Sequence, residues 1–182
     1  MISAEILLKI MPNLKEALCD EYFPFIQQAM DEFEINTPLR ESAFLAQIAH
    51  ESGEFRYLEE LWGPTDAQRR YEPPSKKAND LGNTHPGDGK RFKGRGAIQL
   101  TGRANYKKFG DLLSLDLPTH PEWVATPQVA FRVSAAFWKL NGLNELADQQ
   151  KFETMTRRIN GGLTGLTERL MFYNRAKTLC GA

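Results

Sequence analysis

Cysteine and histidine are scarce in this sequence, with two cysteines and three histidines among 182 residues. The two thiols, Cys19 and Cys180, are too few for a disulfide framework and too few for a cluster of metal ligands. We therefore expect both cysteines to be reduced. The sequence also gives no reason to expect a metal ion or an organic cofactor.

Long apolar runs are absent as well. No stretch approaches the ~18 apolar residues that span a membrane. The N-terminal segment "MISAEILLKIMPNLKEAL" lacks the basic start, apolar block and small-residue cleavage site of a signal peptide. We expect a folded protein that is made in the cytoplasm and initially stays there. Its length suits one domain, which can be divided into two lobes.

An excess of either charge is also missing, because 23 Lys and Arg balance 23 Asp and Glu. The distribution is uneven: residues 1–60 hold twelve acidic and four basic residues. The segment "KRFKGRGAIQLTGRANYKK" (90–108) holds seven cations and no acid, a pattern that could attract a polyanion or form a solvated face. The balanced total and the lack of a nucleic-acid-binding motif argue against nucleic acid as a partner.

Helical patterns dominate the N-terminal third. Apolar residues at three- and four-residue spacing predict helices over 3–18 and 21–34. Thr37 followed by Pro38 is typical of an N-cap and a first helical residue, and it predicts a helix that runs towards Gly53.

The middle of the chain has another character. Ten of the thirty-four residues 63–96 are Gly or Pro, so we expect loops and turns there. The alternation in "AIQLT" (97–101) predicts a short strand. Helices are then expected at about 127–140, 151–159 and 165–179.

The segment "AHESGEFRYLEELWG" (49–63) contains four glutamates. Glu51 falls on the apolar stripe of its helix, three residues after Ile48, and in the last turn, where the helix dipole disfavours an anion. Both effects favour its protonated form near neutral pH. A helix end at Gly53 would let the chain fold back and bring Glu60 opposite Glu51. A protonated carboxyl opposite an ionised one is the pairing that glycoside hydrolysis requires.

The glutamate-rich and glycine-rich segments also have other interpretations. A glutamate-rich stretch is more often a solvated face. "HESGE" does not match the H-E-x-x-H motif of zinc proteases, because position 54 is Glu54. "KGRGAIQ" (93–99) lacks the third glycine of a dinucleotide loop and the Gly-Lys-Ser/Thr ending of a P-loop. Trp62 is a core aromatic by default, although beside the carboxylates it could stack on a sugar ring.

Several motifs together resemble glycoside hydrolase family 19, and in particular its bacteriophage endolysins. They are "FLAQIAHESGEF", "LEELWG", "LGNTHPGDGKRFKGRGAIQLTGRANY", "FWKLNGLNELAD", "RRINGG" and "ERLMFYNRA", in the order found in that family. The match covers about residues 35 to 180. It implies a mostly α, lysozyme-like, two-lobed domain with a small β-hairpin region beside the cleft. We expect one catalytic domain over 1–182, with N-terminal helices in 1–36 packed on it and no separate cell-wall-binding domain.

The resemblance also implies roles for individual residues. Glu51 matches the general acid, Glu60 the general base, with Glu59 as an adjacent rival, and Thr101 the residue that helps hold the attacking water. The residues that match the sugar cleft and the carboxylate network are Gln99, Asn105, Asn160 and Arg169, and Trp62 is added as a candidate substrate contact.

Two departures from the family pattern stand out. Plant chitinases of the family place the second glutamate further along the chain and use disulfides, and this chain does neither. Where many endolysins have Gly-Gly after His-Glu-Ser, this chain has Gly53 and Glu54, which places an additional charge at the edge of the expected cleft.

The resemblance therefore implies an endolysin, expected to be monomeric, that hydrolyses β-1,4 glycosidic bonds of peptidoglycan with inversion. In such a mechanism the carboxyls lie roughly 6.5–9.5 Å apart, and water attacks from the face opposite the acid. The family pattern also implies a holin-like membrane protein that gives access from the host cytoplasm to the periplasm and cell wall. The alternatives are a chitinase with the same machinery and, from another class, an inactive glycan-binding module.

Overall fold

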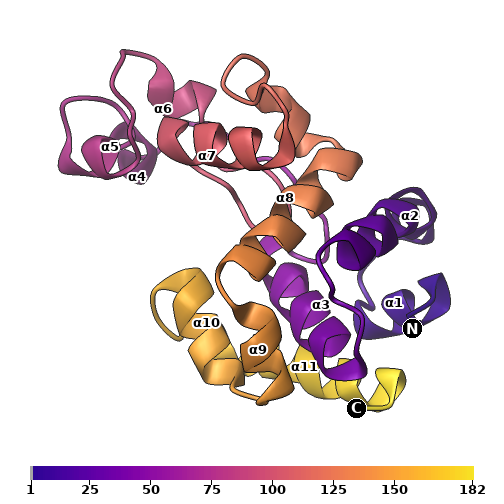
Figure 1. The fold of residues 1–182 in the computed structure, drawn as a ribbon. Coiled ribbons are helices and arrows are strands. Elements are labelled where there is room, and N and C mark those ends of the chain that lie inside the picture. The colour runs from indigo at the N-terminus through magenta and orange to yellow at the C-terminus, as the bar shows by residue number, and fades with distance from the viewer. Residues whose placement is uncertain (1) are drawn as a thin grey trace.

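A computed structural model describes residues 2–182, and the expected mostly α fold is confirmed (Figure 1). None of the described helices is long and apolar enough to cross a membrane. The elements in chain order are α1 Ala4–Ile10, α2 Glu16–Glu32, α3 Pro38–Ser52, α4 Asp66–Arg69, α5 Lys76–Asp80, α6 Asp88–Arg91, α7 Arg103–Leu113, the 3-10 helix η1 Pro121–Ala125, α8 Pro127–Leu140, α9 Leu143–Asp148, α10 Phe152–Asn160 and α11 Leu166–Cys180.

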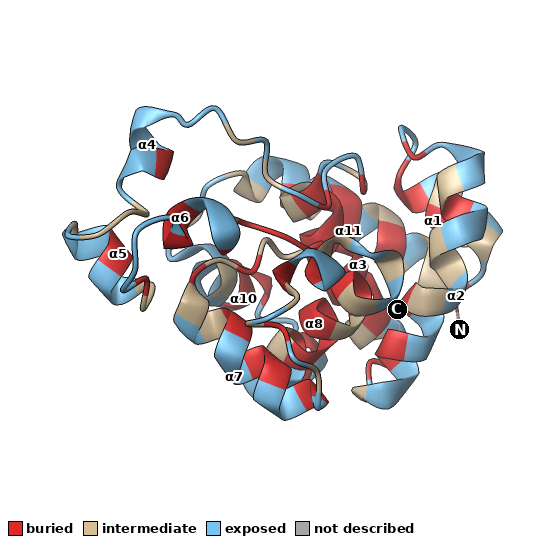
Figure 2. Ribbon diagram, turned by 90° about the horizontal axis from the view of Figure 1, so that it is seen from above, coloured by how far each residue is buried: buried red, intermediate tan, exposed pale blue. Residues whose placement is uncertain are grey.

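Two apolar cores divide the described chain into two lobes, as expected. The larger core joins α1, α2, α3, α9, α10 and α11, and the smaller one lies around α7 and η1. Helix α8 contributes to both, with Phe131 and Trp138 in the larger core and Val133 in the smaller. Figure 1 shows α8 crossing between the two groups of helices. In Figure 2 the buried residues concentrate in α3, α8 and α11, whereas the segment that carries α4 and α5 is largely exposed.

The predicted boundaries of the first two helices are wrong. Helix α1 ends at Ile10, and α2 runs without interruption through the expected gap and through Pro24. Met11, the residue before Pro12, has φ −115° and ψ 83°, because proline disfavours helical conformation in the residue before it. Apolar spacing alone did not place this break.

The prediction for α3 is confirmed. Thr37 has extended backbone and accepts the N–H of Arg40 at 3.3 Å, and Pro38 is the first helical residue. Gly53 closes the helix with φ 58°, a left-handed conformation that glycine adopts at little cost. The acid candidate Glu51 therefore stands in the last turn of a well-delimited helix.

The predicted strand at 97–101 is wrong. Gly96–Gln99 form a turn in which Gln99 has φ 57°, and this turn joins one antiparallel bridge pair, Arg95 and Leu100. A second isolated bridge pairs Arg95 with Glu59. In the expected β-hairpin region, the described residues form these two bridges and no longer strand. The expected loop region 63–96 contains the one-turn helices α4, α5 and α6, connected by turns.

Candidate active site

Glu51 is held by a buried hydrogen-bond network that starts on α11. Arg169, whose side chain is 1% exposed, donates from one terminal nitrogen to Glu51 Oε1 and from the other to Gln47 Oε1 at 2.5 Å. Its Nε donates to the carbonyl of Thr164 at 3.2 Å, and Gln47 in turn donates to Thr156 Oγ1 at 2.9 Å. The carboxyl thus pairs with a cation, whereas its place on the helix suggested apolar surroundings. Its protonation state stays a prediction.

The neighbouring residue joins the same two helices. His50 pairs through Nδ1 with Glu168, one residue before Arg169. A Cβ placed on Gly165 would lie 2.2 Å from the imidazole ring, so only glycine fits beside His50 there. Two consecutive residues of α3 are therefore paired with two consecutive residues of α11, which fixes the end of the helix that carries Glu51.

A left-handed turn follows α3. Gly53, Glu54 and Phe55 have φ values of 58°, 57° and 64°, a conformation that costs roughly 1–2 kcal/mol for each residue other than glycine. Phe55 is buried, and the carboxylate of Glu54 accepts the backbone N–H and the side-chain amide of Asn13, both at 2.7 Å. The additional charge noted in the sequence therefore binds the N-terminal segment.

Glu60 lies where the chain has folded back. Its backbone N–H donates to the Gly94 carbonyl at 2.8 Å, and its Oε2 accepts the Gly94 N–H at 2.9 Å. A Cβ on Gly94 would lie 2.7 Å from Gln99 Oε1, 3.3 Å from Glu60 Oε2 and 3.3 Å from Thr101 Oγ1. The structure therefore brings these three predicted residues together around one glycine that has no room for a side chain.

Thr101, a member of this cluster, is linked to Asn105. The Thr101 hydroxyl donates to the Gln99 carbonyl at 3.0 Å, which orients its lone pairs for accepting a further hydrogen bond. Asn105, in the first turn of α7, donates to the Thr101 carbonyl at 2.8 Å. Asn105 therefore holds the backbone of Thr101. It makes no hydrogen bond to Glu60 within the described chain.

Glu59 points the other way. Its Oε1 accepts Arg95 Nε at 2.8 Å and pairs with Lys93 Nζ at 3.2 Å. Burial alone would raise the pKa of Glu59, but the hydrogen bonds from the two cations outweigh burial and lower it. Successive residues of an extended segment face opposite sides, and here one faces two cations and the other the glycine cluster.

Two aromatic residues lie near Glu60. Trp62 is half-buried and packs against Tyr71, with ring centroids 6.3 Å apart and ring planes tilted by 42°. Burial and the charge of Glu60 raise the pKa of the Tyr71 hydroxyl. Trp62 belongs to neither apolar core, and Tyr71 is a neighbour of the base candidate that no sequence pattern indicated.

Asn160 is hydrogen-bonded to neither group of predicted residues in the described chain: the pair Glu51 and Arg169, or the residues around Gly94. It is the last residue of α10, its side chain is exposed, and no hydrogen bond to either glutamate is recorded for it among residues 2–182. Its role as a substrate contact stays a prediction.

Part of the basic segment 90–108 is paired with carboxylates of the described chain. Of its seven cations, four form ion pairs: Lys93 and Arg95 with Glu59, Arg103 with Asp88, and Lys107 with Asp111. The described residues include no group of three or more His, Cys, Asp or Glu that could hold a metal ion.

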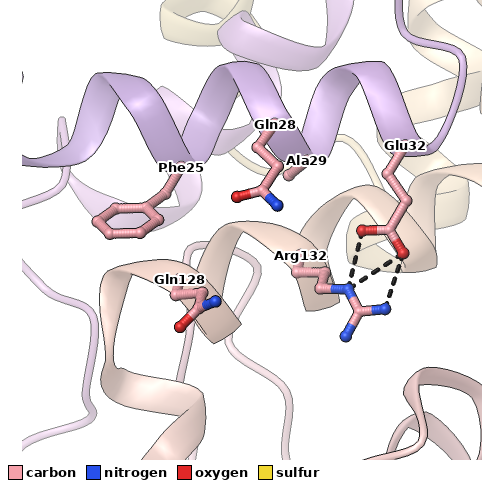
Figure 3. A pocket seen from close by; sticks show the side chains of 6 residues that line it. All are labelled: Phe25, Gln28, Ala29, Glu32, Gln128 and Arg132. Atoms are coloured by element: carbon pink, nitrogen blue, oxygen red, sulfur yellow. Dashed lines mark hydrogen bonds and ion pairs between the residues drawn. The ribbon is translucent and has the colours of Figure 1, made fainter.

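A groove of about 300 Å³ between α2 and α8 lies outside this cluster (Figure 3). Its charged groups are Glu32 and Arg132, which pair at 2.8 Å and so neutralise each other. It has no second carboxyl for acid and base catalysis. The candidate active site therefore comprises the last turn of α3, which carries Glu51, and the Gly94 cluster, which contains Glu60.

Comparison with known proteins identifies the family of the chain. The family profile described as "Chitinase class I", of glycoside hydrolase family 19, matches residues 22–149. A glycosyl hydrolase family 19 domain-containing protein of Haemophilus influenzae is 34% identical over 95% of this chain and 94% of its own length. An endochitinase of Arabidopsis thaliana is 41% identical over 74% of this chain, which spans only 44% of that relative.

Solved structures show the same fold. A bacterial family 19 chitinase superposes with a TM-score of 0.78 at 23% identity, covering 100% of this chain and 95% of the other. Chitinase C of Streptomyces griseus gives a TM-score of 0.77 at 21% identity, covering 100% and 77%. At these identities the likeness carries the fold alone.

Proposed function

The chain belongs to glycoside hydrolase family 19, and from this membership and the geometry of its two carboxyl groups we propose that it is an endolysin that cleaves β-1,4 bonds of peptidoglycan with inversion. The observation that carries the proposal is the different setting of the two glutamates. Glu51 is fixed through one oxygen by a cation, whereas Glu60 is fixed through both oxygens by uncharged N–H donors.

Glu51 is the proposed general acid. Arg169 engages Oε1, and the structure records no partner for Oε2 among the described residues. Oε2 is therefore the oxygen that can carry a proton and deliver it to the leaving glycosidic oxygen. The buried network behind Arg169 holds this carboxyl in one orientation, and positioning of an acid contributes typically 10²–10⁴-fold to rate.

Glu60 is the proposed general base. Both of its oxygens accept N–H groups, an arrangement suited to an ionised carboxylate, which has acceptors only. Thr101 Oγ1 lies beside the same glycine, and its free lone pairs can accept a hydrogen bond from a water that Glu60 activates. A held water implies direct attack on the sugar, which is the inverting pathway.

We propose Gln99, Asn105, Asn160, Arg169 and Trp62 as the residues that line or support the sugar cleft. Gln99, Asn105 and Arg169 act partly through other groups: Gln99 borders Gly94, Asn105 holds Thr101 and Arg169 holds Glu51. The half-buried ring of Trp62 offers apolar surface for a sugar ring.

Peptidoglycan is the proposed polymer, and chitin is the second candidate. The bacterial relative matches over nearly its whole length, which supports a bacterial polymer. The names of the plant relatives, which are endochitinases, favour chitin. We further propose action as a monomer on the cell wall, reached from the host cytoplasm with the help of a holin-like membrane protein.

Parallel digests test this proposal. Purified peptidoglycan and chitin are each incubated with the parent and with Glu51→Gln, and the products are identified by mass spectrometry. Release of amino-sugar fragments from peptidoglycan by the parent alone supports the endolysin. Fragments from chitin alone assign the protein to the chitinases, and no fragments from either polymer would favour the inactive binding module.

A further inference from the structure

Gln68 is a buried residue of the one-turn helix α4, and its side-chain amide makes four hydrogen bonds. The side chain is 3% exposed. Its Oε1 accepts the backbone N–H groups of Gly63 at 3.1 Å and Thr65 at 2.8 Å. Its Nε2 donates to the carbonyl of Leu61 at 2.7 Å and to Glu60 Oε1 at 2.9 Å.

These contacts leave one orientation for the amide. A primary amide offers two N–H donors and two acceptor lone pairs, and here all four are used. Turning the amide over would place its NH₂ group against two backbone N–H donors and its oxygen against a carboxylate and a carbonyl. The loop itself therefore aims an N–H donor at Glu60.

We propose that Gln68 is the positioning residue of the general base, acting through Glu60 without touching the substrate. This inference rests on the proposed function of Glu60. Gln68 holds Oε1 and the Gly94 N–H holds Oε2, so the plane of the carboxylate is fixed by a donor on each side. The lone pairs that remain are the ones that can accept a proton from water.

A purely structural role is the competing explanation, because Gln68 also closes the loop 61–65. The two roles overlap at Nε2, which donates both to the Leu61 carbonyl within the loop and to Glu60, whereas Oε1 serves the loop alone. Closure of the turn depends on Oε1 and on the Thr65 hydroxyl, which accepts the Gln68 N–H at 3.2 Å. Positioning of the base depends on Nε2.

Gln68→Glu keeps an oxygen in the place of Oε1 and replaces the NH₂ group by a second oxygen. It keeps acceptors for the Gly63 and Thr65 N–H groups, loses the donors to Glu60 and to the Leu61 carbonyl, and places a second carboxyl beside Glu60. We expect kcat to fall on the order of 10²-fold, the effect of a misplaced catalytic group, with KM nearly unchanged. The acidic limb of the kcat profile should move to higher pH, because two carboxyls that share a site disfavour double ionisation.

Two variants serve as comparators, each assayed at a temperature where it is folded. Thr65→Val removes the cap of α4 and leaves the Gln68 donor in place. It should therefore lower the melting temperature and leave kcat close to that of the parent. Gln27→Glu makes the same chemical change on the exposed face of α2 and should match the parent. A kcat for Gln68→Glu equal to or above that of Thr65→Val, with an unmoved acidic limb, overturns the inference.

Glu60→Gln distinguishes failure of this inference from failure of the proposed function. If Glu60→Gln is inactive while Gln68→Glu turns over like the parent, Glu60 remains the base and Gln68 only closes the loop. If Glu60→Gln retains full activity, the assignment of the base fails and the inference fails with it.

Discussion

Replacing Glu51 by glutamine should abolish hydrolysis and also lower stability. The amide preserves the shape of the side chain but has no acidic proton to deliver. From the position of Glu51 on the helix alone, the neutral side chain would be expected to stabilise the protein, because burial and the helix dipole both disfavour the anion. For the ionised form of Glu51 the structure reverses this expectation, because Arg169 is 1% exposed and Glu51 is its counter-charge.

The size of the loss follows from what the amide keeps. The glutamine oxygen can still accept from Arg169, so the buried cation keeps a hydrogen bond but loses its counter-charge. Removing one partner of a buried ion pair costs ~3–5 kcal/mol, and the hydrogen bond that remains on the cation contributes ~1.5–3 kcal/mol, which leaves a loss of about 1–2 kcal/mol. For a chain of this length that lowers the melting temperature by roughly 2–8 °C. Glu51→Met also removes the acceptor and should cost ~3–5 kcal/mol.

Thermal unfolding followed by circular dichroism gives the melting temperatures of the parent and the two Glu51 variants. Glu21→Gln, on the exposed face of α2, is the control for loss of one surface carboxylate. We expect the parent to melt highest, then Glu51→Gln, then Glu51→Met. A cell-wall clearing assay on the same samples should show a loss of roughly 10²–10⁴-fold for Glu51→Gln. A melting temperature for Glu51→Gln at or above that of the parent refutes the stabilising role of the pair, and retained clearing refutes the role as acid.

Three further predictions test other parts of the protein. Glu60→Gln should remove most turnover, whereas Glu59→Gln should mainly lower the melting temperature, because Glu59 faces Lys93 and Arg95. Initial rates and melting curves of both variants measure these effects. A larger loss of rate in Glu59→Gln than in Glu60→Gln would move the base to Glu59. Thr101→Val should lower kcat and leave glycan binding largely intact, as measured by turnover beside pull-down on insoluble substrate; loss of binding would make Thr101 a substrate contact instead. Burial alone would raise the pKa of Asp88, but Arg103 and two backbone N–H groups lower it to about 2. The ionised carboxylate contributes roughly 2 kcal/mol to the free energy of unfolding above about pH 4, and this contribution is lost as the pH falls towards 2. The difference in free energy of unfolding between the parent and Asp88→Asn, measured with urea, should therefore narrow over that range. A constant difference would contradict this prediction.

Local signals in the sequence were sufficient to predict where helix α3 begins and ends. Thr37, Pro38 and Gly53 each act on the backbone next to them, so their effect does not depend on the rest of the fold. The turn at 97–101 could not be predicted in this way. Ile98 and Leu100 alternate with polar residues as in a strand, but Gln99 takes a left-handed conformation in which its amide donates to the Gly96 carbonyl at 3.0 Å. The Gly96 N–H also donates to the Leu58 carbonyl at 2.8 Å, so a contact with a segment distant in sequence overrode the local pattern there.

The candidate site was predictable to a similar degree. The residue types and the family motifs identify Glu51, Glu60 and Thr101, and the structure places Glu60 and Thr101 around one glycine. The supporting amides were not found. Gln68 is readable from the sequence as part of a capping box, Thr-x-x-Gln, which predicts a helix start. Its second task, donation to Glu60, depends on a chain reversal that no local pattern shows, and the same holds for Gln47 behind Arg169.

The configuration of the new reducing end tests the central claim most directly. Proton NMR of a β-linked glycan digest, recorded before mutarotation, reports whether water or the enzyme attacked the anomeric carbon. Water activated by Glu60 and held by Thr101 attacks opposite the leaving group, so the account predicts α product at the earliest time points. An initial β product would mean that a carboxylate is the nucleophile, and it would contradict the roles assigned to Glu60 and Thr101.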